Sequence, residues 1–570
     1  MEKEVLISFQ DFGFQYTAQA EPTLYNIDLD IHRGEKILIA GPSGCGKSTL
    51  AHCINGLIPA SYPGKITGKL TVKGEDAAKL GLFGLAKTVG TVLQDSDAQF
   101  IGLTVAEDIA FALENDCIPT QQLHKMVGDT AALVNISDFL HHAPHEVSGG
   151  QKQRVGLAGV MVNHVDVLLF DEPLANLDPA TGKTAIELID EIQKATGCAV
   201  VIIEHRLEDV LHRHVDRVVV MENGRIRFDG CPHLLLCQNL LQECGIREPL
   251  YITALKYAGV QLRPEMRPAY IDTLQLSAAQ KQQVLDWFTR QAAPEAEPEK
   301  PALLEVKNIG FAYDNGHKAL KDISLSIRKG EMLSIVGTNG AGKSTFSKVL
   351  CGFEQPQQGT LRFDGEDLFA LSIKERADRM GYVMQNPNQM ISKTMIFDEV
   401  ALGLRNRGVP EDEIRTRVEE TLKICGLYPF RNWPISALSY GQRKRVTIAA
   451  ILVLRPEMIL LDEPTAGQDF RHYTEIMDFL WEINRLGTTV VLITHDMHLM
   501  LEYTPRAIVF HSGQVIADCS AAEVLNSPKI VQQANLKETS LYHLSQLCGI
   551  PDGEEFTRRF IARDQEVRKV

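Results

Sequence analysis

Short runs of apolar residues recur along the chain, and several are bounded by glycine-rich or acidic segments. KILIA at 36–40 and MLSIV at 332–336 directly precede glycine-rich loops. VDVLLF and MILL end at the acidic residues Asp171 and Asp462. Continuous apolar runs of this length are typical of parallel strands that are buried on both faces. The pattern therefore predicts an α/β fold with such strands in both halves of the chain.

Other segments have a helical period. Within residues 231–290, LLLCQNLLQECGI and AAQKQQVLDWFTR predict amphipathic helices. The segment QAAPEAEPEKP at 291–301 is rich in Pro, Ala and Glu, which predicts an extended or disordered linker. The longest apolar run, 448–454, has seven residues, whereas a membrane-spanning helix needs about 20. We therefore expect no membrane-spanning helix, and the N-terminus lacks the basic and apolar regions of a signal peptide.

The two halves repeat each other at an offset of about 290 residues. GPSGCGKST returns as GTNGAGKST, VSGGQKQRV as LSYGQRKRV, and LLFDEPLANLD as ILLDEPTAGQD. A period this long indicates that each copy is a whole domain and not a solenoid unit. Segments 242–260 and 532–550 also resemble each other, which predicts a small helical appendage after each copy.

These patterns predict four regions. We expect domains at 1–230 and 303–528, an appendage with the linker at 231–302, and a C-terminal appendage at 529–570. The formal net charge of −15 disfavours a nucleic-acid binder, since phosphate neutralisation needs clustered Lys and Arg. The eleven cysteines contain no Cys-x-x-Cys, which disfavours a zinc or iron–sulfur site.

Each half contains GxxxxGK[ST] after an apolar strand, a pattern typical of a phosphate-binding P-loop. Glycines let the backbone wrap closely, so that its N–H groups and the N-terminus of the next helix face the phosphates. Lys47 and Lys343 are expected to reach the β- and γ-phosphates, and Ser48 and Ser344 to bind Mg²⁺. The remaining ATP-binding candidates in these loops are Gly41, Ser43, Gly44, Gly46, Thr49, Gly337, Asn339, Gly340, Gly342 and Thr345.

An Asp-Glu pair ends a buried strand in each half. Asp171 and Asp462 are expected to hold Mg²⁺, directly or through water. Glu172 and Glu463, one residue further, are placed to polarise the attacking water as general bases. Their position after a P-loop in both halves favours this role over that of a solvated loop.

The segment between the P-loop and the acidic pair narrows the choice among P-loop NTPases. Ser148-Gly149-Gly150-Gln151 resembles the signature motif of ABC-type ATPases, in which a Ser hydroxyl and Gly N–H groups at a helix N-terminus cap a γ-phosphate. The resemblance implies two P-loop cassettes of the ABC type, each with a helical subdomain, packed head to tail so that each signature completes the other's site.

The other motifs of that family follow in order. Gln94 and Gln385 resemble the Q-loop glutamine, which contacts Mg²⁺ and the water. Asp178 and Asp469 match the D-loop, and His205 and His495 match the switch histidine that contacts the γ-phosphate. Tyr16 and Tyr313 lie where the family stacks an aromatic ring on adenine, although an aromatic residue in a first strand is often simply core.

The second signature departs from the family pattern, because Tyr440 replaces its first glycine. Ser439, Gly441 and Gln442 remain, so a γ-phosphate cap is still expected. Neither half lacks a catalytic carboxylate or histidine. We therefore predict that both composite sites hydrolyse ATP, to unequal extents.

The segments after the Q-loops resemble those of the ATPases of energy-coupling factor (ECF) importers. QDSDAQFIGLTVAEDIAFALEN and QNPNQMISKTMIFDEVALGLRN carry the second glutamines Gln99 and Gln389, and the acidic pairs Glu107-Asp108 and Asp398-Glu399. The resemblance implies a bacterial protein, peripheral on the cytoplasmic face of the membrane. It implies two partners, a transmembrane coupling (T-type) protein and a small substrate-binding (S-type) membrane protein. The implied cargo is a vitamin, a vitamin precursor or a metal ion.

Two alternatives stay open at this point. One is a soluble twin-cassette ATPase acting in translation, although residues 231–300 carry 7 Lys or Arg and 8 Asp or Glu and are therefore nearly neutral. The other is the fused ATPase of a sugar-type importer, a family that usually shows one degraded site. On the ECF interpretation, Phe100, Ile101, Met390 and Ile391, if exposed, would form a dock for the membrane partner.

Overall fold

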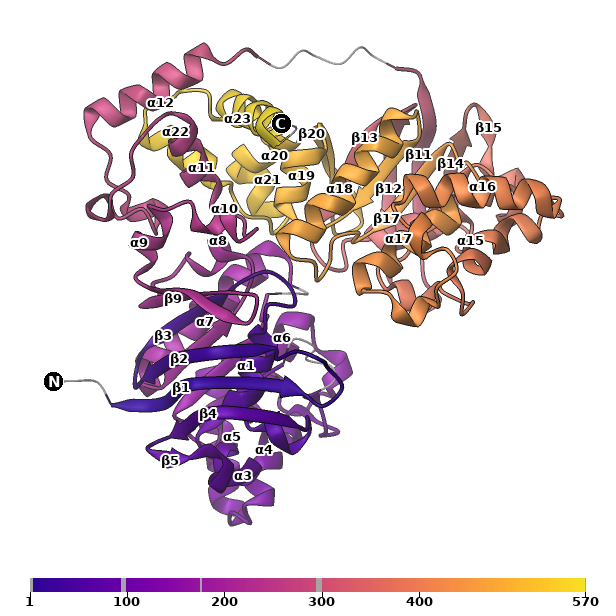
Figure 1. Ribbon diagram of the computed structural model, residues 1–570. Coiled ribbons are helices and arrows are strands. Elements are labelled where there is room, and N and C mark those ends of the chain that lie inside the picture. The colour runs from indigo at the N-terminus through magenta and orange to yellow at the C-terminus, as the bar shows by residue number, and fades with distance from the viewer. Residues whose placement is uncertain (1–3, 94–98, 175–176, 294–299, 569–570) are drawn as a thin grey trace. The chain divides into compact units, whose positions relative to one another are not determined.

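The computed structural model describes residues 4–93, 99–174, 177–293 and 300–568, and the chain divides into two compact units, Met1–Val284 and Leu285–Val570. Each unit contains a four-stranded antiparallel sheet and a six-stranded sheet that is parallel except at one edge. The strand order is the same in both units, so the repeat in the sequence is a repeat of the fold. Figure 1 draws the first unit mainly in indigo and purple and the second mainly in orange and yellow. The predicted α/β class with two tandem domains is confirmed.

In the first unit the sheet orders are β2-β1-β4-β5 and β10-β9-β3-β8-β7-β6. The strands are β1 (Val5–Tyr16), β2 (Leu24–His32), β3 (Lys36–Ala40), β4 (Gly64–Val72), β5 (Glu75–Asp76), β6 (Val89–Val92), β7 (Val167–Asp171), β8 (Ala199–Ile203), β9 (Arg217–Glu222) and β10 (Arg225–Gly230). Strands β6, β7, β8, β3 and β9 are parallel, so their carboxyl ends meet at one edge of the sheet. The P-loop and the first acidic pair follow β3 and β7 at this edge.

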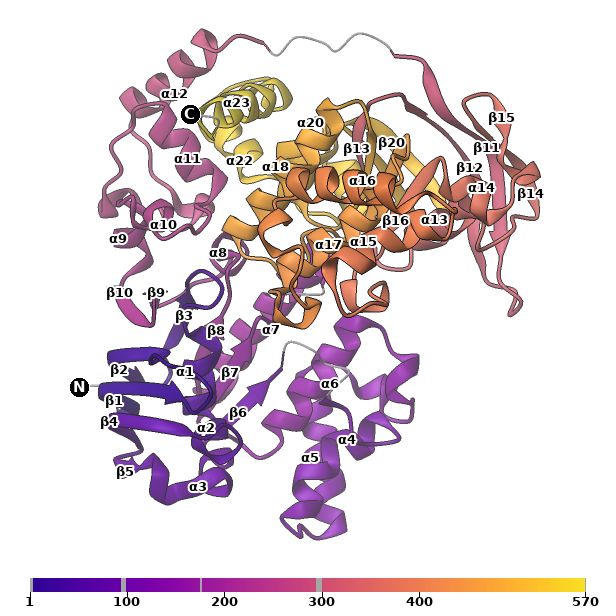
Figure 2. The same ribbon diagram turned by 45° about the vertical axis from the view of Figure 1, so that its right-hand side comes forward.

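The α-helices of the first unit connect its strands and follow its last strand, and the last of them, α12, runs across the boundary between the two units. They are α1 (Lys47–Ile54), α2 (Leu57–Ala60), α3 (Ala77–Ala86), α4 (Val105–Asn115), α5 (Thr120–Leu133), α6 (Gly149–Met161), α7 (Pro179–Thr196), α8 (Leu207–Val210), α9 (Pro232–Leu236), α10 (Leu240–Glu243), α11 (Leu250–Tyr257) and α12 (Ala278–Arg290). Figure 2 shows α4, α5 and α6 side by side, and these three helices contact one another. They form a helical subdomain whose helix α6 begins with the signature motif.

The core of the first unit lies between its two sheets. Phe9, Phe12 and Phe14 of β1 are buried together with the apolar residues of β3. The alternation of buried and exposed residues in β2 matches a strand with one solvated face, whereas every residue of β3 and β8 is buried. Lys36, the first residue of β3, is buried and forms an ion pair with buried Asp190 of α7.

In the second unit the sheet orders are β12-β11-β14-β15 and β16-β17-β18-β13-β19-β20. The strands are β11 (Ala302–Ala312), β12 (Lys318–Arg328), β13 (Met332–Gly337), β14 (Gln358–Phe363), β15 (Glu366–Asp367), β16 (Met380–Val383), β17 (Met458–Asp462), β18 (Thr489–Ile493), β19 (Arg506–His511) and β20 (Gln514–Ser520). The helices are α13 (Lys343–Cys351), α14 (Ile373–Ala377), α15 (Ile396–Arg405), α16 (Glu411–Ile424), α17 (Tyr440–Leu452), α18 (Phe470–Arg485), α19 (Met497–Tyr503), α20 (Ala521–Asn526), α21 (Pro528–Gln533), α22 (Ser540–Leu547) and α23 (Gly553–Arg568). The predicted strands before each P-loop and acidic pair are therefore all present.

Small helices follow each cassette, as predicted. The two segments that resemble each other in sequence each contain an eight-residue helix at the matching position, α11 and α22. In the second unit, α23 covers this region, and its buried Phe556 contacts the rings of Trp287 and Phe288 at 6.0 and 5.9 Å. Among the described residues, no helix is both long and apolar enough to cross a membrane.

Candidate active site

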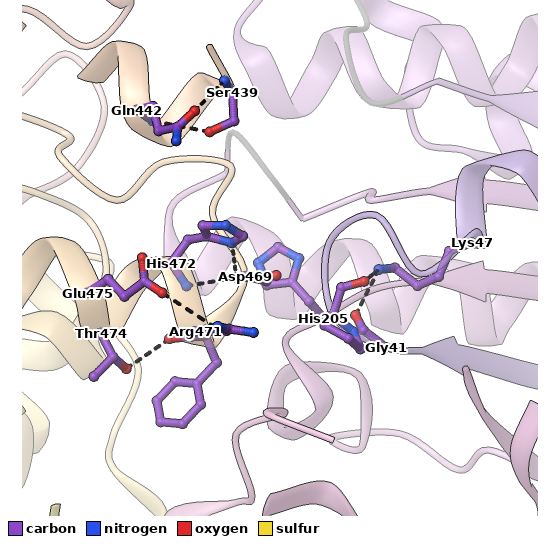
Figure 3. A network of polar contacts seen from close by, with 12 residues as sticks. Gly41, Lys47, His205, Ser439, Gln442, Asp469, Arg471, His472, Thr474 and Glu475 are labelled. Atoms are coloured by element: carbon purple, nitrogen blue, oxygen red, sulfur yellow. Dashed lines mark hydrogen bonds and ion pairs between the residues drawn. The ribbon is translucent and has the colours of Figure 1, made fainter. Parts of the chain in front are cut away.

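The two P-loops have the same geometry. Lys47, the first residue of α1, donates from Nζ to the carbonyls of Gly41 and Pro42 at 2.7 and 2.9 Å (Figure 3). Lys343, the first residue of α13, donates to Gly337 and Thr338 at 2.7 and 2.9 Å. Both lysines are buried, so each ammonium group is held inside the loop and not in solvent. Each loop thus places one cation and the N-terminus of a helix at the same point, which suits a phosphate group.

Glycine is required at the last position before each lysine. Gly46 and Gly342 have φ of 103° and 102°, a left-handed conformation that L-residues rarely adopt. A Cβ at Gly342 would lie 2.6 Å from the carbonyl oxygen of Ala319. The predicted P-loop glycines are therefore explained by backbone conformation and close packing.

The predicted adenine-stacking tyrosines lie beside the P-loop helices. The hydroxyl of Tyr16 is 3.1 Å from that of Thr49, and the hydroxyl of Tyr313 is 3.0 Å from that of Thr345. Both rings are partly exposed. These contacts fix the rings near the loops, and stacking on adenine stays a prediction.

Oxygen ligands suited to Mg²⁺ are present next to each P-loop. Ser48 is the second residue of α1, and α1 contacts β7, which ends at Asp171. Burial raises the pKa of Asp171, whereas the charges of His52 and Lys47 lower it. A hydroxyl and a carboxylate are hard oxygen donors of the kind that Mg²⁺ prefers, so the residues present fit the ion. Ser48 and Asp171 would hold the ion, which would neutralise charge that develops on the phosphates.

The second acidic pair is part of a hydrogen-bond network. Asp462 accepts a hydrogen bond from the Tyr382 hydroxyl at 3.0 Å. Burial raises the pKa of Asp462, and the negative charge of Glu463 raises it further. Burial and the charge of Asp462 raise the pKa of Tyr382, which therefore remains protonated and donates.

The second catalytic candidate, Glu463, is fixed from two sides. Its Oε1 accepts the backbone N–H of His495 at 3.1 Å and lies 2.7 Å from His495 Nδ1. Its Oε2 accepts the hydroxyl of buried Thr494 at 3.2 Å. Glu463 also has φ of 45°, and Glu172 has φ of 50°, so both candidates hold the same rare left-handed conformation.

The first catalytic candidate has a different neighbour. Glu204 occupies the position of Thr494 and is fully buried. One oxygen of Glu204 accepts the backbone N–H groups of His205 and Arg206 at 2.9 and 3.2 Å. His205 Nδ1 lies 3.2 Å from Glu204 and 3.8 Å from Glu172. Burial and the charge of Glu204 raise the pKa of Glu172 to about 7, while Lys47 lowers it.

The two Q-loops follow β6 and β16. Gln94 lies outside the described residues. The carbonyl oxygen of Gln385 accepts Lys444 Nζ at 2.7 Å and the Tyr440 hydroxyl at 3.4 Å, and its side chain is exposed. Gln99 supports the first Q-loop, since its side chain bonds to the backbone of Thr91 and Leu93 at 3.4 and 3.3 Å.

Both signature serines begin a helix. Ser148 caps α6, and its hydroxyl accepts the N–H of Gln151, whose side chain accepts the N–H of Ser148. Ser439 and Gln442 form the same reciprocal pair at the start of α17 (Figure 3). A Cβ at Gly149, the position of Tyr440, would meet nothing within 4 Å. This position therefore tolerates a side chain without distortion of the cap.

The D-loop aspartates cap the next helices. Asp178 accepts the N–H and the hydroxyl of Thr181, each at 3.0 Å. Asp469 accepts the N–H of His472 at 2.9 Å and lies 2.7 Å from its Nδ1 (Figure 3). Gly150 and Gly441 lie against these helices, since an added Cβ would be 2.9 Å from Thr181 and 3.2 Å from Gln468. Each signature and D-loop are therefore packed together within their own cassette.

Three polar residues of the site were missed by the sequence argument. Tyr382, Lys444 and Glu204 replace Thr91, Gln153 and Thr494 at matching positions of the other cassette. The sequence signal that could have revealed these three residues is that they differ between two otherwise similar halves.

The four residues named for a dock differ in exposure. Ile101 is 63% exposed, whereas Met390 and Ile391 are partly buried against the core of the second cassette, and Phe100 is partly buried. The exposure on which the dock depends is therefore met in full by Ile101 alone among these four, and docking of a partner stays a prediction.

In both units, a P-loop, a strand ending in Asp-Glu, a strand followed by histidine and a serine-capped helix define an ABC-type ATPase cassette. Residues 24–175 and 320–466 match the family model described as ABC transporter, and residues 238–311 match one described as ATP-binding cassette cobalt transporter. The chain belongs to the ABC transporter family as an ATP-binding protein with two cassettes. It binds ATP with Mg²⁺ and hydrolyses it to drive transport.

Bacterial relatives resemble this chain over its full length. A "Putative ABC transporter ATP-binding protein" of Clostridium perfringens is 56% identical over 568 residues, which cover 100% of both chains. A relative of the same description from Enterococcus faecalis is 55% identical and covers 99% of this chain and 100% of its own. The solved structure of cbiO1 from Clostridium perfringens, described as part of the ABC transporter complex cbiONQ, is 34% identical and covers 43% of this chain and 100% of its own, with a TM-score of 0.39.

Proposed function

We propose that this chain is the ATP-hydrolysing subunit of an ECF-type importer for a vitamin, a vitamin precursor or a metal ion. It would act on the cytoplasmic face of the membrane with a T-type coupling protein and a small S-type substrate-binding protein. The match of residues 238–311 to a cobalt-transporter model supports a place among such importers. The proposed domain boundaries are those expected from the sequence, 1–230, 231–302, 303–528 and 529–570.

The observation that carries this proposal is the loop after the first Q-loop. Asp108 accepts the N–H groups of Ile101 and Gly102 at 2.8 and 3.1 Å. Glu107 accepts those of Leu103 and Thr104 at 3.0 and 3.2 Å. The acidic pair that resembles the ECF family thus fixes the loop through four backbone hydrogen bonds. Because the two carboxylates accept four consecutive backbone N–H groups, they hold the loop in one conformation.

The fixed loop presents apolar side chains to solvent. Ile101 is 63% exposed and Leu103 is 81% exposed. Exposed apolar residues on a rigid loop are typical of a surface that a partner covers. Because the Q-loop is adjacent, a helix of the coupling protein docked here would be in contact with the segment that responds to ATP.

The second cassette uses a related arrangement. Glu399 is buried and accepts the N–H groups of Ser392 and Lys393 at 2.9 and 2.6 Å. Its partner Asp398 instead forms an ion pair with Arg405 at 2.9 Å. Asp108 and Glu399 at matching positions therefore both accept backbone N–H groups of the loop, whereas Glu107 and Asp398 differ in their partners. This difference suits two non-identical contacts with one coupling protein.

We further propose that ATP is held head to tail at two composite sites. The first combines Lys47, Ser48, Gln94, Asp171, Glu172 and His205 with Ser439 and Gly441. The second combines Lys343, Ser344, Gln385, Asp462, Glu463 and His495 with Ser148 and Gly150. The support is that both signature serines cap helix N-termini, where backbone N–H groups favour an anion.

Affinity purification of the tagged chain from detergent-solubilised membranes of its host tests the transport role. Recovery of one polytopic protein and one or more small hydrophobic proteins is expected. Ile101→Glu with Leu103→Glu should strongly reduce this recovery, whereas Leu486→Glu, an equally exposed apolar site on the second cassette, should not. Unchanged recovery with the double variant would contradict the docking surface, and ribosomal proteins in place of membrane proteins would favour the translation alternative.

A further inference from the structure

The signature helix of the second cassette is attached to the Q-loop of the same cassette. Lys444, on the second turn of α17, donates from Nζ to the carbonyls of Met384 and Gln385 at 2.8 and 2.7 Å. Tyr440, the first residue of α17, donates its hydroxyl to the same Gln385 carbonyl at 3.4 Å. Both acceptors follow β16 directly. Two side chains of one helix therefore converge on the backbone of the proposed Mg²⁺-contacting glutamine.

The burial of Lys444 makes this attachment specific. Only 1% of the residue is exposed, so water does not compete with the two carbonyls. Charged donors form stronger hydrogen bonds than neutral ones. The carboxylates of Asp462 and Glu463 are near enough to act on the ammonium electrostatically. The amine is thus surrounded by the Q-loop backbone and by the acidic pair of its own cassette.

The first cassette carries other residues at these two positions. Gly149 replaces Tyr440 and has no side chain with which to reach a carbonyl. Gln153 replaces Lys444, and its Nε2 donates to the carbonyl of Pro173 at 2.8 Å. In the described part of the chain, Gln153 therefore bonds the first signature helix to the segment after the acidic pair, whereas Lys444 at the matching position bonds the second to the Q-loop.

We propose that Lys444 and Tyr440 are positioning residues that couple the two ATP sites in one direction. When nucleotide binding at the second P-loop displaces the backbone of Gln385, the bonds from Lys444 and Tyr440 move α17 and thereby Ser439. Ser439 serves the first composite site, so occupancy of the second P-loop controls hydrolysis at Glu172. This inference rests on the head-to-tail sites proposed above.

The reverse coupling should be weaker, because Gly149 and Gln153 do not provide the same pair of bonds. Coupling between two sites typically changes affinity or rate by about 5- to 150-fold. If the side chains of Lys444 and Tyr440 carry most of this coupling, replacing both should weaken the coupling about tenfold. The departure of the second signature from the family pattern then has a function, since the hydroxyl of Tyr440 supplies one of the bonds.

The test measures turnover at the first site with the second P-loop able or unable to bind ATP. Full-length chains carrying Glu463→Gln, which should bind but not hydrolyse, are compared with chains carrying Lys343→Ala, which should not bind. We define the coupling ratio as kcat/KM of the Glu463→Gln chain divided by kcat/KM of the Lys343→Ala chain. Adding Tyr440→Gly with Lys444→Gln, the residues of the first cassette, should lower this ratio about tenfold, mainly through kcat. Lys444→Arg, which keeps the cation, should retain most of it.

An independent measurement follows the Q-loop itself. Amide hydrogen exchange of residues 384–392 in the full-length chain should become faster in the double variant, while β13 and β18 stay protected. Tyr440 is 41% exposed, so Tyr440→Gly alone serves if the double variant does not fold. A coupling ratio that stays within twofold of the parent, in whichever of these variants folds, would overturn the inference.

One further variant separates this inference from the proposal beneath it. Ser439→Ala in the Glu463→Gln chain should slow turnover at Glu172 if the sites are composite. No effect of Ser439→Ala would refute the head-to-tail sites and with them the inference. A slower Ser439→Ala chain combined with an unchanged coupling ratio in the Tyr440→Gly and Lys444→Gln variants would refute the inference alone.

Discussion

Replacing Thr494 with valine removes one hydroxyl from the second catalytic centre while nearly preserving the shape of the side chain. This hydroxyl donates to Oε2 of Glu463 at 3.2 Å, and Oε1 of the same carboxylate is held by His495. The variant therefore leaves the histidine contact in place and frees only one end of the proposed general base. The hydroxyl that is removed donates to the glutamate, so the expected defect is in kcat and not in KM.

The magnitude follows from the type of bond. Hydrogen bonds to charged groups contribute about 1.5–3 kcal/mol, and water does not replace this donor because Thr494 is fully buried. If the full value supports the reactive orientation, a factor of ten for each 1.36 kcal/mol gives a fall of about 10- to 150-fold in kcat. We expect the lower end of this range, because His495 still restrains the carboxylate.

The assay is steady-state phosphate release by the Glu172→Gln chain, in which we expect only the second site to turn over. The Thr494 hydroxyl also accepts the N–H of Asp496 at 2.9 Å. A change in the loop that carries His495 must therefore be distinguished from the loss of the bond to Glu463. Thr494→Ser keeps both hydrogen bonds and should retain activity within about threefold. A valine variant that turns over within twofold of its parent, with an unchanged melting temperature, would refute the orienting role of the hydroxyl.

Three other outcomes are expected. The double variant Glu172→Gln, Glu463→Gln should lose phosphate release but still bind ATP, as measured by equilibrium dialysis. Phosphate release by the double variant would contradict the assignment of the two glutamates as general bases. Chelation of Mg²⁺ should stop phosphate release by the unsubstituted chain. Asp190→Asn leaves buried Lys36 without its charged partner and should cost about 3–5 kcal/mol in urea unfolding of the first unit. Lys194→Ala removes a side chain that is 72% exposed and should cost less than about 1 kcal/mol, so equal effects of the two variants would contradict this. Phe556→Ala removes a fully buried ring and should cost about 3–5 kcal/mol in the second unit, and a calorimetric scan showing no lower transition would count against that packing.

The sequence was sufficient for the fold because its signals were local. The buried strands before Gly41, Asp171 and their counterparts are continuous apolar runs, and the glycines of the P-loops report a backbone conformation. The duplication also made each half a check on the other. Fold class, cassette number and the order of the motifs could therefore be predicted from residues that are neighbours in the chain.

The arrangement of the polar side chains could not be predicted in this way. Lys444 and Gln385 are 59 residues apart, and the ammonium reaches the Q-loop only because α17 packs beside β16. Glu204 resembles any acidic residue at a strand end, and its burial beside Glu172 depends on three strands meeting at one edge. The exposure of Met390 and Ile391 was left open for the same reason, since an apolar residue in a loop does not reveal which way the loop folds.

Both candidate catalytic glutamates, Glu172 and Glu463, occupy a left-handed backbone conformation, and this makes them unusual targets for directed evolution. Such a conformation costs an L-residue on the order of 1 kcal/mol, and glycine would adopt it without that penalty. A library of this chain selected only for resistance to heat should therefore enrich glycine or asparagine at positions 172 and 463. Those survivors would be more stable and unable to turn over ATP, so any screen for a hardier transporter must select for activity in the same round.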